Sequence, residues 1–255
     1  MDSNKLAHEP IGEKFVKADF HIHTPESKCY SDPSTTQEQI VFASRAAGLE
    51  AIAITDHNTV CGVESIKELG KEKGIAVFPG VELSTRGGHV IALFDRETPI
   101  SILQDFLNSV GVTPAERGDG SIPTSDRLED VFRKIYEWKG ISIAAHIERF
   151  PTGFLETTEH RSVKMRIHSN QYLGALEITQ PQNKELWNKG LVPGYPKKYA
   201  CLQGSDAHSV KEIGRRATYL RLPSLDLEGL RVAFSEFETR IKFPEEMGEQ
   251  GQIRE

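Results

Sequence analysis

The chain has 255 residues, a formal net charge of −6, 38% hydrophobic residues and 27% charged residues. This length suits one large α/β domain or two small ones, and the composition is that of an ordinary globular protein. No apolar run approaches the roughly 18 residues of a membrane helix, and residues 1–10 lack a signal-peptide pattern. We therefore expect a cytoplasmic protein with no membrane partner. The acidic balance also argues against coating nucleic acid through bulk charge.

The cysteines Cys29, Cys61 and Cys201 are scattered, without a CxxC pair. An odd and small number of cysteines argues against a disulfide framework and fits a reducing compartment. A thiolate metal site is disfavoured for the same reason. If the protein binds metal, we expect nitrogen and oxygen ligands.

Short apolar runs alternate with segments of helical periodicity along the chain. The expected strands are 18–22, 51–55, 76–81, 90–94, 141–145, 175–179, 199–203 and 218–222. The expected helices are 36–47, 63–73, 100–110, 125–138 and 225–237. Such alternation predicts a mostly parallel sheet with crossover helices.

Seven or eight strands in this length favour a closed or nearly closed β/α barrel. An open, doubly wound sheet is the structural alternative. Neither the GxGxxG nor the GxxxxGK[ST] phosphate-binding motif occurs in the chain, which weakens the nucleotide-binding forms of that alternative.

Side chains that bind metals stand at the ends of five expected strands. His21 and His23 end the first strand and project from the same face, because residues i and i+2 of a strand do so. The others are Asp56 and His57 after the second strand, Glu82 after the third, His146 after the fifth, and Asp206 with His208 after the seventh. The carboxyl ends of barrel strands meet on one face, so these residues should gather there. His89 precedes its strand, and needs a reversed strand or a distorted segment to join them.

Histidine and carboxylate ligands without cysteine suit zinc, manganese or iron. Carboxylates can also bridge two metals about 3.5–4 Å apart, an arrangement that activates water and stabilises the entering and leaving oxygens of a phosphoryl group. Phosphoester hydrolysis is the reaction that such a site serves best. Amide or lactam hydrolysis is the chemical alternative.

These motifs resemble those of the PHP (polymerase and histidinol phosphatase) family of metal-dependent phosphoesterases. The matching segments, in chain order, are His21-x-His23, Thr55-Asp56-His57, Gly80-Val81-Glu82, Gly88-His89, Ala145-His146 and Ser205-Asp206-Ala207-His208. The resemblance implies a single α/β domain, a distorted (β/α)7 barrel over residues 18–240. It would follow an N-terminal extension at residues 1–17 and precede a polar C-terminal tail at residues 241–255.

The resemblance also implies a centre of two or three divalent ions, which would be manganese, zinc or iron. The implied ligands are His21, His23, Glu82 and Asp206 for the first ion; Glu82, His89 and His146 for the second; and His57 and His208, with Asp32 as the candidate for a further ligand, for the third. In many relatives the serine-aspartate pair sits closer to the paired histidines than Asp32 does here.

Arg149 matches an arginine that grips the substrate phosphate in the nucleotide-hydrolysing branch of the family. The family's usual proline after the fifth-strand histidine is absent, since Ile147 follows His146. A planar guanidinium suits phosphate because it pairs two oxygens at once; the alternative is a solvated loop arginine. The residues expected to act in catalysis are Arg149, Asp206 and His208.

Three other polar residues carry weaker expectations. We expect Asp56 to orient a ligand and Glu177 to be buried and hydrogen-bonded rather than a ligand. His168 has polar sequence neighbours, so we expect it at the surface. The basic run at residues 160–166 is interpreted as a solvated helix face.

The leading hypothesis is a hydrolase that acts on nucleotide or nucleic-acid phosphoesters through metal-activated hydroxide. Residues 20–30 and 87–89 are most similar to PHP domains coupled to large ATPases, which implies an ATPase partner, because the chain has no P-loop. Two alternatives stay open. One is a small-molecule phosphatase for histidinol phosphate or a sugar phosphate, which the acidic composition favours. The other is a non-catalytic, metal-stabilised module in an ATPase complex.

Overall fold

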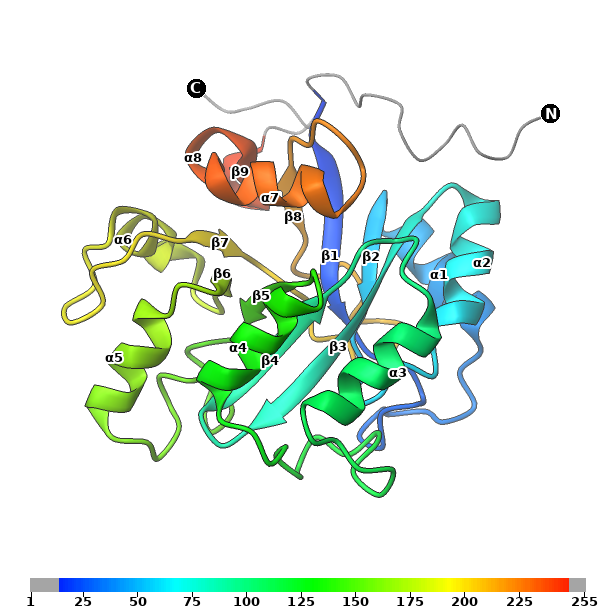
Figure 1. Ribbon diagram of the computed structural model, residues 1–255. Helices are drawn as coiled ribbons and strands as arrows, with labels where there is room; N and C mark the ends of the chain where they lie inside the picture. Colours follow the sequence, from blue (N-terminus) through cyan, green and yellow to red (C-terminus); the bar gives the residue numbers. More distant parts are fainter. Residues whose placement is uncertain (1–13, 248–255) are drawn as a thin grey trace.

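The computed structural model describes residues 14–247, which form one sheet with helices packed around it (Figure 1). The strands are β1 (Val16–Ile22), β2 (Ala51–Ile54), β3 (Ala76–Thr85), β4 (Gly88–Leu93), β5 (Ile141–Ala144), β6 (Leu173–Glu177), β7 (Ala200–Leu202), β8 (Thr218–Leu220) and β9 (Ile241–Lys242). Their spatial order is β7-β6-β5-β4-β3-β2-β1-β8-β9, and the two edge strands β7 and β9 approach each other. The sheet is therefore a nearly closed barrel, as predicted, and not an open one.

The barrel closes at a seam between β1 and the segment that follows β7. Ile22 in β1 forms a parallel bridge with Ala207, and the amide of His23 donates to the carbonyl of Ala207 at 3.0 Å. The segment that follows β7 thus contacts the carboxyl end of β1 directly.

Five of the eight helices described correspond to expected ones, and three do not. The helices are α1 (Gln37–Ala46), α2 (Val63–Lys73), α3 (Ile100–Ser109), α4 (Leu128–Glu137), α5 (Arg161–Ser169), α6 (Lys184–Lys189), α7 (Leu227–Ser235) and α8 (Phe237–Arg240), with short 3₁₀ turns at Pro181–Asn183 and Pro244–Glu246. α5, α6 and α8 were not among the expected helices. α5 contains most of the basic run that was interpreted as a helix face, and α6 has only six residues. Within residues 14–247, no helix is both long and apolar enough to cross a bilayer.

β4 runs against both of its neighbours. It pairs antiparallel with β3 and with β5, whereas β1, β2 and β3 are mutually parallel. The reversal comes at a tight turn into Gly88, whose φ of +125° is a conformation that L side chains rarely adopt. A Cβ at Gly88 would also lie 2.8 Å from the backbone nitrogen of Phe154. Of the two possibilities expected for His89, a reversed strand or a distorted segment, the structure shows the reversed strand.

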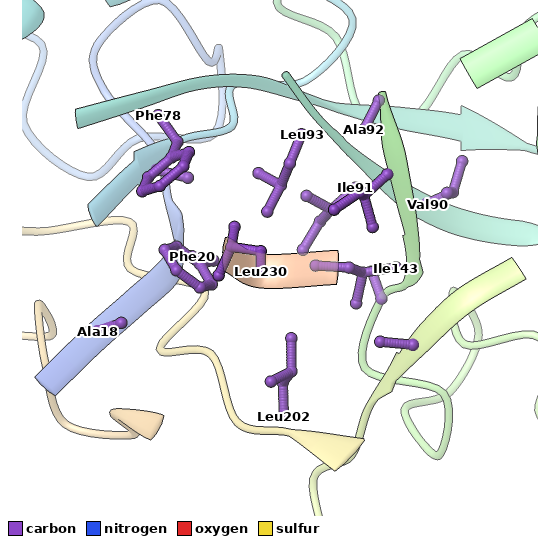
Figure 2. Close-up of a cluster of buried hydrophobic side chains, with 14 of the residues drawn as sticks. Ala18, Phe20, Phe78, Val90, Ile91, Ala92, Leu93, Ile143, Leu202 and Leu230 are labelled. Atoms are coloured by element: carbon purple, nitrogen blue, oxygen red, sulfur yellow. The ribbon is translucent and has the colours of Figure 1, made fainter. Parts of the chain in front are cut away.

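The interior of the barrel is apolar at the end where β1 begins. Figure 2 shows the buried cluster there, to which β1, β3, β4, β5 and β7 all contribute side chains. Leu230 of α7 is fully buried among them, and Figure 1 places α7 at this end of the barrel. Because α7 covers the amino end, the carboxyl ends of the parallel strands are the ones left for a site.

The fold extends beyond one of the predicted limits. Ile241–Lys242 pairs with β8, and Phe243 and Met247 are buried, so the predicted polar tail at 241–255 begins within the packed fold. At the other end, β1 begins at Val16. Residues 1–13 and 248–255, which include most of the predicted extension and the rest of the tail, lie outside the described residues.

The expectation that His168 lies at the surface is wrong. Its side chain is fully buried on α5, where the rings of Trp187, Tyr195 and Tyr199 lie 5.1 to 5.6 Å from it, centroid to centroid. These aromatic residues come from distant parts of the chain, so the polar sequence neighbours of His168 gave no sign of them.

Candidate metal centre

Glu82, in β3, is fully buried at the centre of a histidine cluster. Its Oε2 atom lies 3.3 Å from Nε2 of His21, 3.3 Å from Nε2 of His23 and 2.9 Å from Nδ1 of His57. Despite this proximity, Glu82 Oε2, His21 Nε2 and His57 Nδ1 have no hydrogen-bond partner. Atoms that bind one cation at about 2.0–2.2 Å lie about 3 Å apart. The spacing therefore fits ligands that share a cation.

The other oxygen of Glu82 faces a second pair of rings. Oε1 lies 2.9 Å from Nδ1 of His89 and 2.9 Å from Nε2 of His146. His89 reaches this position because β4 runs antiparallel to β3, with Ser84 opposite His89 in the register. The two carboxylate oxygens thus face different histidines, which is the arrangement of a carboxylate that bridges two metals.

Asp206 adds a second carboxylate from the segment that follows β7. Its Oδ1 atom lies 3.1 Å from Nε2 of His21 and 3.0 Å from Nε2 of His23. Asp206 and His146 both adopt a positive φ, of 49° and 27°. Such conformations cost non-glycine residues about 1–3 kcal/mol each and persist where the surroundings enforce them, as at functional sites.

Three sets of donor atoms within the described residues lie within 4.8 Å of one another. They are His21, His23, Glu82 and Asp206; His57, Glu82 and His89; and His23, His57 and His208. The first set coincides with the ligands implied for the first ion. The second set shares Glu82 and His89 with the ligands implied for the second ion, and His146, the third of those ligands, also lies beside Glu82. The third set shares His57 and His208 with the ligands implied for the third ion and adds His23. Nitrogen and carboxylate oxygen atoms at this spacing fit divalent cations such as zinc, manganese and iron.

Asp32 lies outside these three sets. Its side chain is exposed, and Oδ1 accepts hydrogen bonds from the amide of Ser34 at 2.9 Å and from its hydroxyl at 2.7 Å. Ligation by Asp32 stays a prediction.

Arg149 stands where the buried cluster meets an open pocket. Its guanidinium contacts Oδ2 of Asp206, and its side chain is 37% exposed. The pocket has a volume of about 440 Å³. Its lining residues are Lys28, Cys29, His57, His89, Asp119, Gly120, Ser121, His146, Arg149, Thr152, Asp206 and His208. The three residues expected to act in catalysis, Arg149, Asp206 and His208, all line this pocket.

Glu177, at the end of β6, orients His21. Its Oε2 atom lies 2.7 Å from Nδ1 of His21, and its Oε1 accepts from the amide of His146 at 3.3 Å. A carboxylate on the far nitrogen fixes the ring and makes the facing nitrogen a better ligand. The expectation of a buried, hydrogen-bonded role for Glu177 is confirmed.

Asp56 orients His23 through a serine. The hydroxyl of Ser27 donates to Oδ1 of Asp56 at 2.6 Å and lies 3.0 Å from Nδ1 of His23. Asp56 also accepts from the amide and hydroxyl of Thr24, both at 2.7 Å. The predicted supporting role of Asp56 is confirmed, whereas Ser27 and Thr24 were missed because a serine or threonine in a loop gives no distinctive signal.

The charges of the cluster are tightly linked. Burial alone would raise the pKa of Glu82, yet the neighbouring imidazoles, His21 foremost, hold that pKa well below its ordinary value. Burial alone would lower the pKa of His21, yet Glu177 and then Glu82 raise it to about 10. Burial lowers the pKa values of four other rings, those of His23, His89, His146 and His208. Neutral imidazole is the form that binds metals.

Gly120 is a further residue of the site that no sequence pattern indicated. A Cβ at Gly120 would lie 2.6 Å from Nε2 and Cδ2 of His57, so this position leaves room only for glycine beside the ring. The surrounding segment is an irregular loop, and the requirement becomes visible only when the loop is placed against β2 and β3.

A barrel with a buried histidine and carboxylate cluster at the carboxyl ends of its strands suits a metal-dependent hydrolase. The sequence profile of the PHP domain matches residues 19–178. The chain belongs to the PHP domain family and is a hydrolase of the phosphoester class. The donor cluster and the family together indicate divalent metal ions as cofactors.

Several known proteins are similar to this chain. An uncharacterised protein of Methanocaldococcus jannaschii is 33% identical over 138 residues, which are 51% of this chain and 67% of that protein. A 5′-3′ exoribonuclease of Haemophilus influenzae is 34% identical over 88 residues, which are 32% of this chain and 31% of that protein. The lesion-specific endonuclease Q of Pyrococcus furiosus shares the fold, with a TM-score of 0.68 at 17% identity over 90% of this chain and 57% of that one. The chain thus spans only part of both nucleases.

Proposed function

We propose that this chain hydrolyses phosphoester bonds of nucleotides or nucleic acids with two or three divalent ions, manganese, zinc or iron. The observation that carries the proposal is the buried Glu82 carboxylate, which faces five imidazoles beside a pocket that contains an arginine. Two similarities support a nucleic-acid substrate. One is the exoribonuclease; the other is endonuclease Q, which has been solved with a 27-mer duplex that carries an abasic lesion at its active site.

The ligands would be the implied set: His21, His23, His57, Glu82, His89, His146, Asp206 and His208. Divalent ions held there would supply an activated water and offset the negative charge of the phosphoryl group. Glu82 and Asp206 keep the donor rings together, and Glu177 and Asp56 hold the orientation of two of them. Whether Asp32 is a further ligand is tested by the metal content of Asp32→Ala.

Arg149 would bind the substrate phosphate at the edge of the cluster. Its guanidinium is partly exposed and already contacts a carboxylate oxygen, which resembles a phosphate oxygen in charge and geometry. A phosphoester that enters the pocket meets this guanidinium next to the donor rings. Arg149 therefore orients the phosphate and stabilises the charge that develops on it.

The test is hydrolysis of a mixed panel by the manganese-loaded protein. The panel contains single-stranded RNA and DNA, 3′,5′-bisphosphonucleotides, histidinol phosphate and sugar phosphates. Asp206→Asn removes one ligand charge at nearly constant volume and should lower turnover by roughly 100-fold or more. Asp130→Asn is the matched control, because Asp130 lies on the surface of α4, where it pairs with Arg133 at 3.6 Å.

Turnover of nucleic acids or nucleotides that is lost in Asp206→Asn and kept in Asp130→Asn supports the proposal. Turnover of histidinol or sugar phosphates alone would replace it with the small-molecule phosphatase. No turnover with metal bound would favour the non-catalytic module.

We further propose that the chain acts beside an ATPase, as its similarity to ATPase-coupled PHP domains implies. The chain is also 25% identical to the DNA polymerase III PolC-type protein of Bacillus cereus over 226 residues, which are 71% of this chain and 15% of that protein, so a polymerase is the alternative partner. Affinity purification of the chain from its own cells, followed by mass spectrometry, tests this. An ATPase recovered in stoichiometric amount supports it, and a polymerase subunit in its place would contradict it.

A further inference from the structure

Phe150 lies in the turn between β5 and α5, and its side chain is 76% exposed. Among the described phenylalanines, only Phe42 on α1 is comparably exposed, at 75%. A single exposed apolar side chain is not unusual. Phe150 differs from Phe42 in its position, because Phe150 directly follows Arg149, which lines the pocket.

The backbone on both sides of Phe150 is fixed to the site. The amide of Arg149 donates to the carbonyl of His146 at 2.8 Å, and the carbonyl of Thr152 accepts from the amide of His89 at 2.8 Å. His146 and His89 are both proposed metal ligands. The turn is therefore attached to the candidate centre through hydrogen bonds on each side of Phe150.

A second anchor holds the turn from the other direction. The carboxylate of Glu148 accepts from the amides of Thr179 at 3.0 Å and Gln180 at 2.9 Å, and from the side chain of Asn183 at 2.7 Å. The turn is thus tied to the segment that follows β6. An exposed ring on such a rigid turn loses little conformational freedom when a ligand covers it.

Phe150 also stands between two residues that line the pocket. Arg149 and Thr152 both do so, and successive Cα atoms are about 3.8 Å apart. Lys28 lines the same pocket and has a largely exposed side chain, so the pocket has two cations, and Phe150 is the direct chain neighbour of one of them, Arg149. Phosphate groups of a ligand would pair with the two cations, and a flat apolar group of the same ligand would stack on the phenyl ring.

We infer that Phe150 is a stacking platform for the nucleobase next to the phosphoester that is cleaved. The inference rests on the proposed function and narrows it, because the substrate is then an unpaired stretch or end of a nucleic acid. Bases of an intact duplex are already stacked on their neighbours, so a base must leave the stack to cover the ring. Stacking on a phenyl face does not depend on base identity, and sequence preference should be weak.

The test compares two oligonucleotides of equal length that differ only in their bases. One is a fluorescein-labelled single strand, and the other is its abasic counterpart with the same phosphates. Binding is measured by fluorescence anisotropy in the Asp206→Asn background, in which turnover is suppressed, and hydrolysis is measured with the native residue at 206. Phe150→Ala removes the ring, Phe150→Trp retains an aromatic face, and Phe42→Ala removes an equally exposed phenylalanine on a different element, α1.

Phe150→Ala should weaken binding of the strand with bases by about 10-fold or more and leave binding of the abasic strand unchanged. Phe150→Trp should restore the difference in affinity between the strand with bases and the abasic strand. Phe42→Ala should leave that difference unchanged. Equal affinities of the native chain and Phe150→Ala for the strand with bases would overturn the inference, as would an equal loss on both strands.

Binding and hydrolysis separate this inference from the proposed function. Hydrolysis that is unaffected by Phe150→Ala, together with unaffected binding, overturns stacking and leaves the phosphoesterase intact. Base-dependent binding through Phe150 without any hydrolysis would contradict the proposed reaction and support the stacking platform.

Discussion

The guanidinium of Arg149 contacts Oδ2 of Asp206, whose Oδ1 faces two buried histidines. Asp206 therefore joins the donor cluster to the residue that would meet the substrate phosphate. An arginine held in this way is already oriented before the substrate arrives. Its loss should affect the reaction without affecting the cluster behind it.

Replacement of Arg149 by alanine should lower kcat/KM for the nucleic-acid substrate about 100-fold, which is typical of a removed charge-stabilising group. Arg149→Lys should recover part of this loss, since a lysine keeps the charge but not the two-pronged geometry. Steady-state kinetics measures both, and metal analysis should give native content in each variant. Arg133→Ala, on the surface of α4, is the control. Native kinetics in Arg149→Ala would identify a solvated loop arginine.

Replacement of Glu177 by glutamine should weaken metal binding about 10- to 100-fold while the fold is retained. The reason is the 2.7 Å contact between its Oε2 and Nδ1 of His21, which an amide cannot reproduce with the same charge. Metal titration followed by calorimetry measures the affinity, and circular dichroism checks the fold. Glu228→Gln, at an exposed position of α7, should leave the affinity unchanged. Loss of folded protein in Glu177→Gln would show a structural role instead.

Replacement of Gly120 by alanine should displace the ring of His57 and lower turnover at least about 10-fold, because small misplacements of a catalytic group are costly. The added methyl would lie 2.6 Å from that ring, too close for any real contact. Ser101→Ala, at an exposed position of α3, is the control. Unchanged kinetics in Gly120→Ala would show that the loop can move aside.

Replacement of His168 by phenylalanine should make the protein less sensitive to acid. Burial lowers the pKa of His168 to about 4, and both ring nitrogens lack a hydrogen-bond partner. Between its ordinary pKa of 6.5 and about 4, the unfolded chain binds a proton that the folded chain does not, so stability falls as pH falls through this window.

The loss is about 1.4 kcal/mol for each pH unit crossed. Urea unfolding at pH 7.5 and pH 5 should therefore show a fall for the native chain that is about 2 kcal/mol larger than for His168→Phe. Trp187→Phe, which alters a neighbouring ring without removing a titrating group, is the control. Equal falls in the native and His168→Phe proteins would contradict the expectation.

Much of the fold follows from patterns that are local in the sequence. The helix at Val63–Lys73 is found at its predicted limits, and all eight expected strands exist, because each is a compact apolar run between turn residues. Even the reversed direction of β4 could be argued, since His89 precedes its strand.

The parts that were missed depend on tertiary contacts. α5 begins with a basic run and α6 has only six residues, and their positions come from packing, α5 against β6 and α6 against β7. Ser27 and Gly120 gain their roles only when loops distant in sequence meet at the centre. His168 is buried by rings from another part of the chain, which no local pattern reveals.

The contact of Ala207 with β1 links the candidate centre to the closure of the barrel. His23 and Asp206 are 183 positions apart, and their side chains meet where the segment after β7 reaches β1. Any opening along this seam pulls Asp206 away from His21 and His23. The candidate centre thus also joins the first strand of the barrel to the segment that follows β7, and separation of the two would remove Asp206 from the donor cluster.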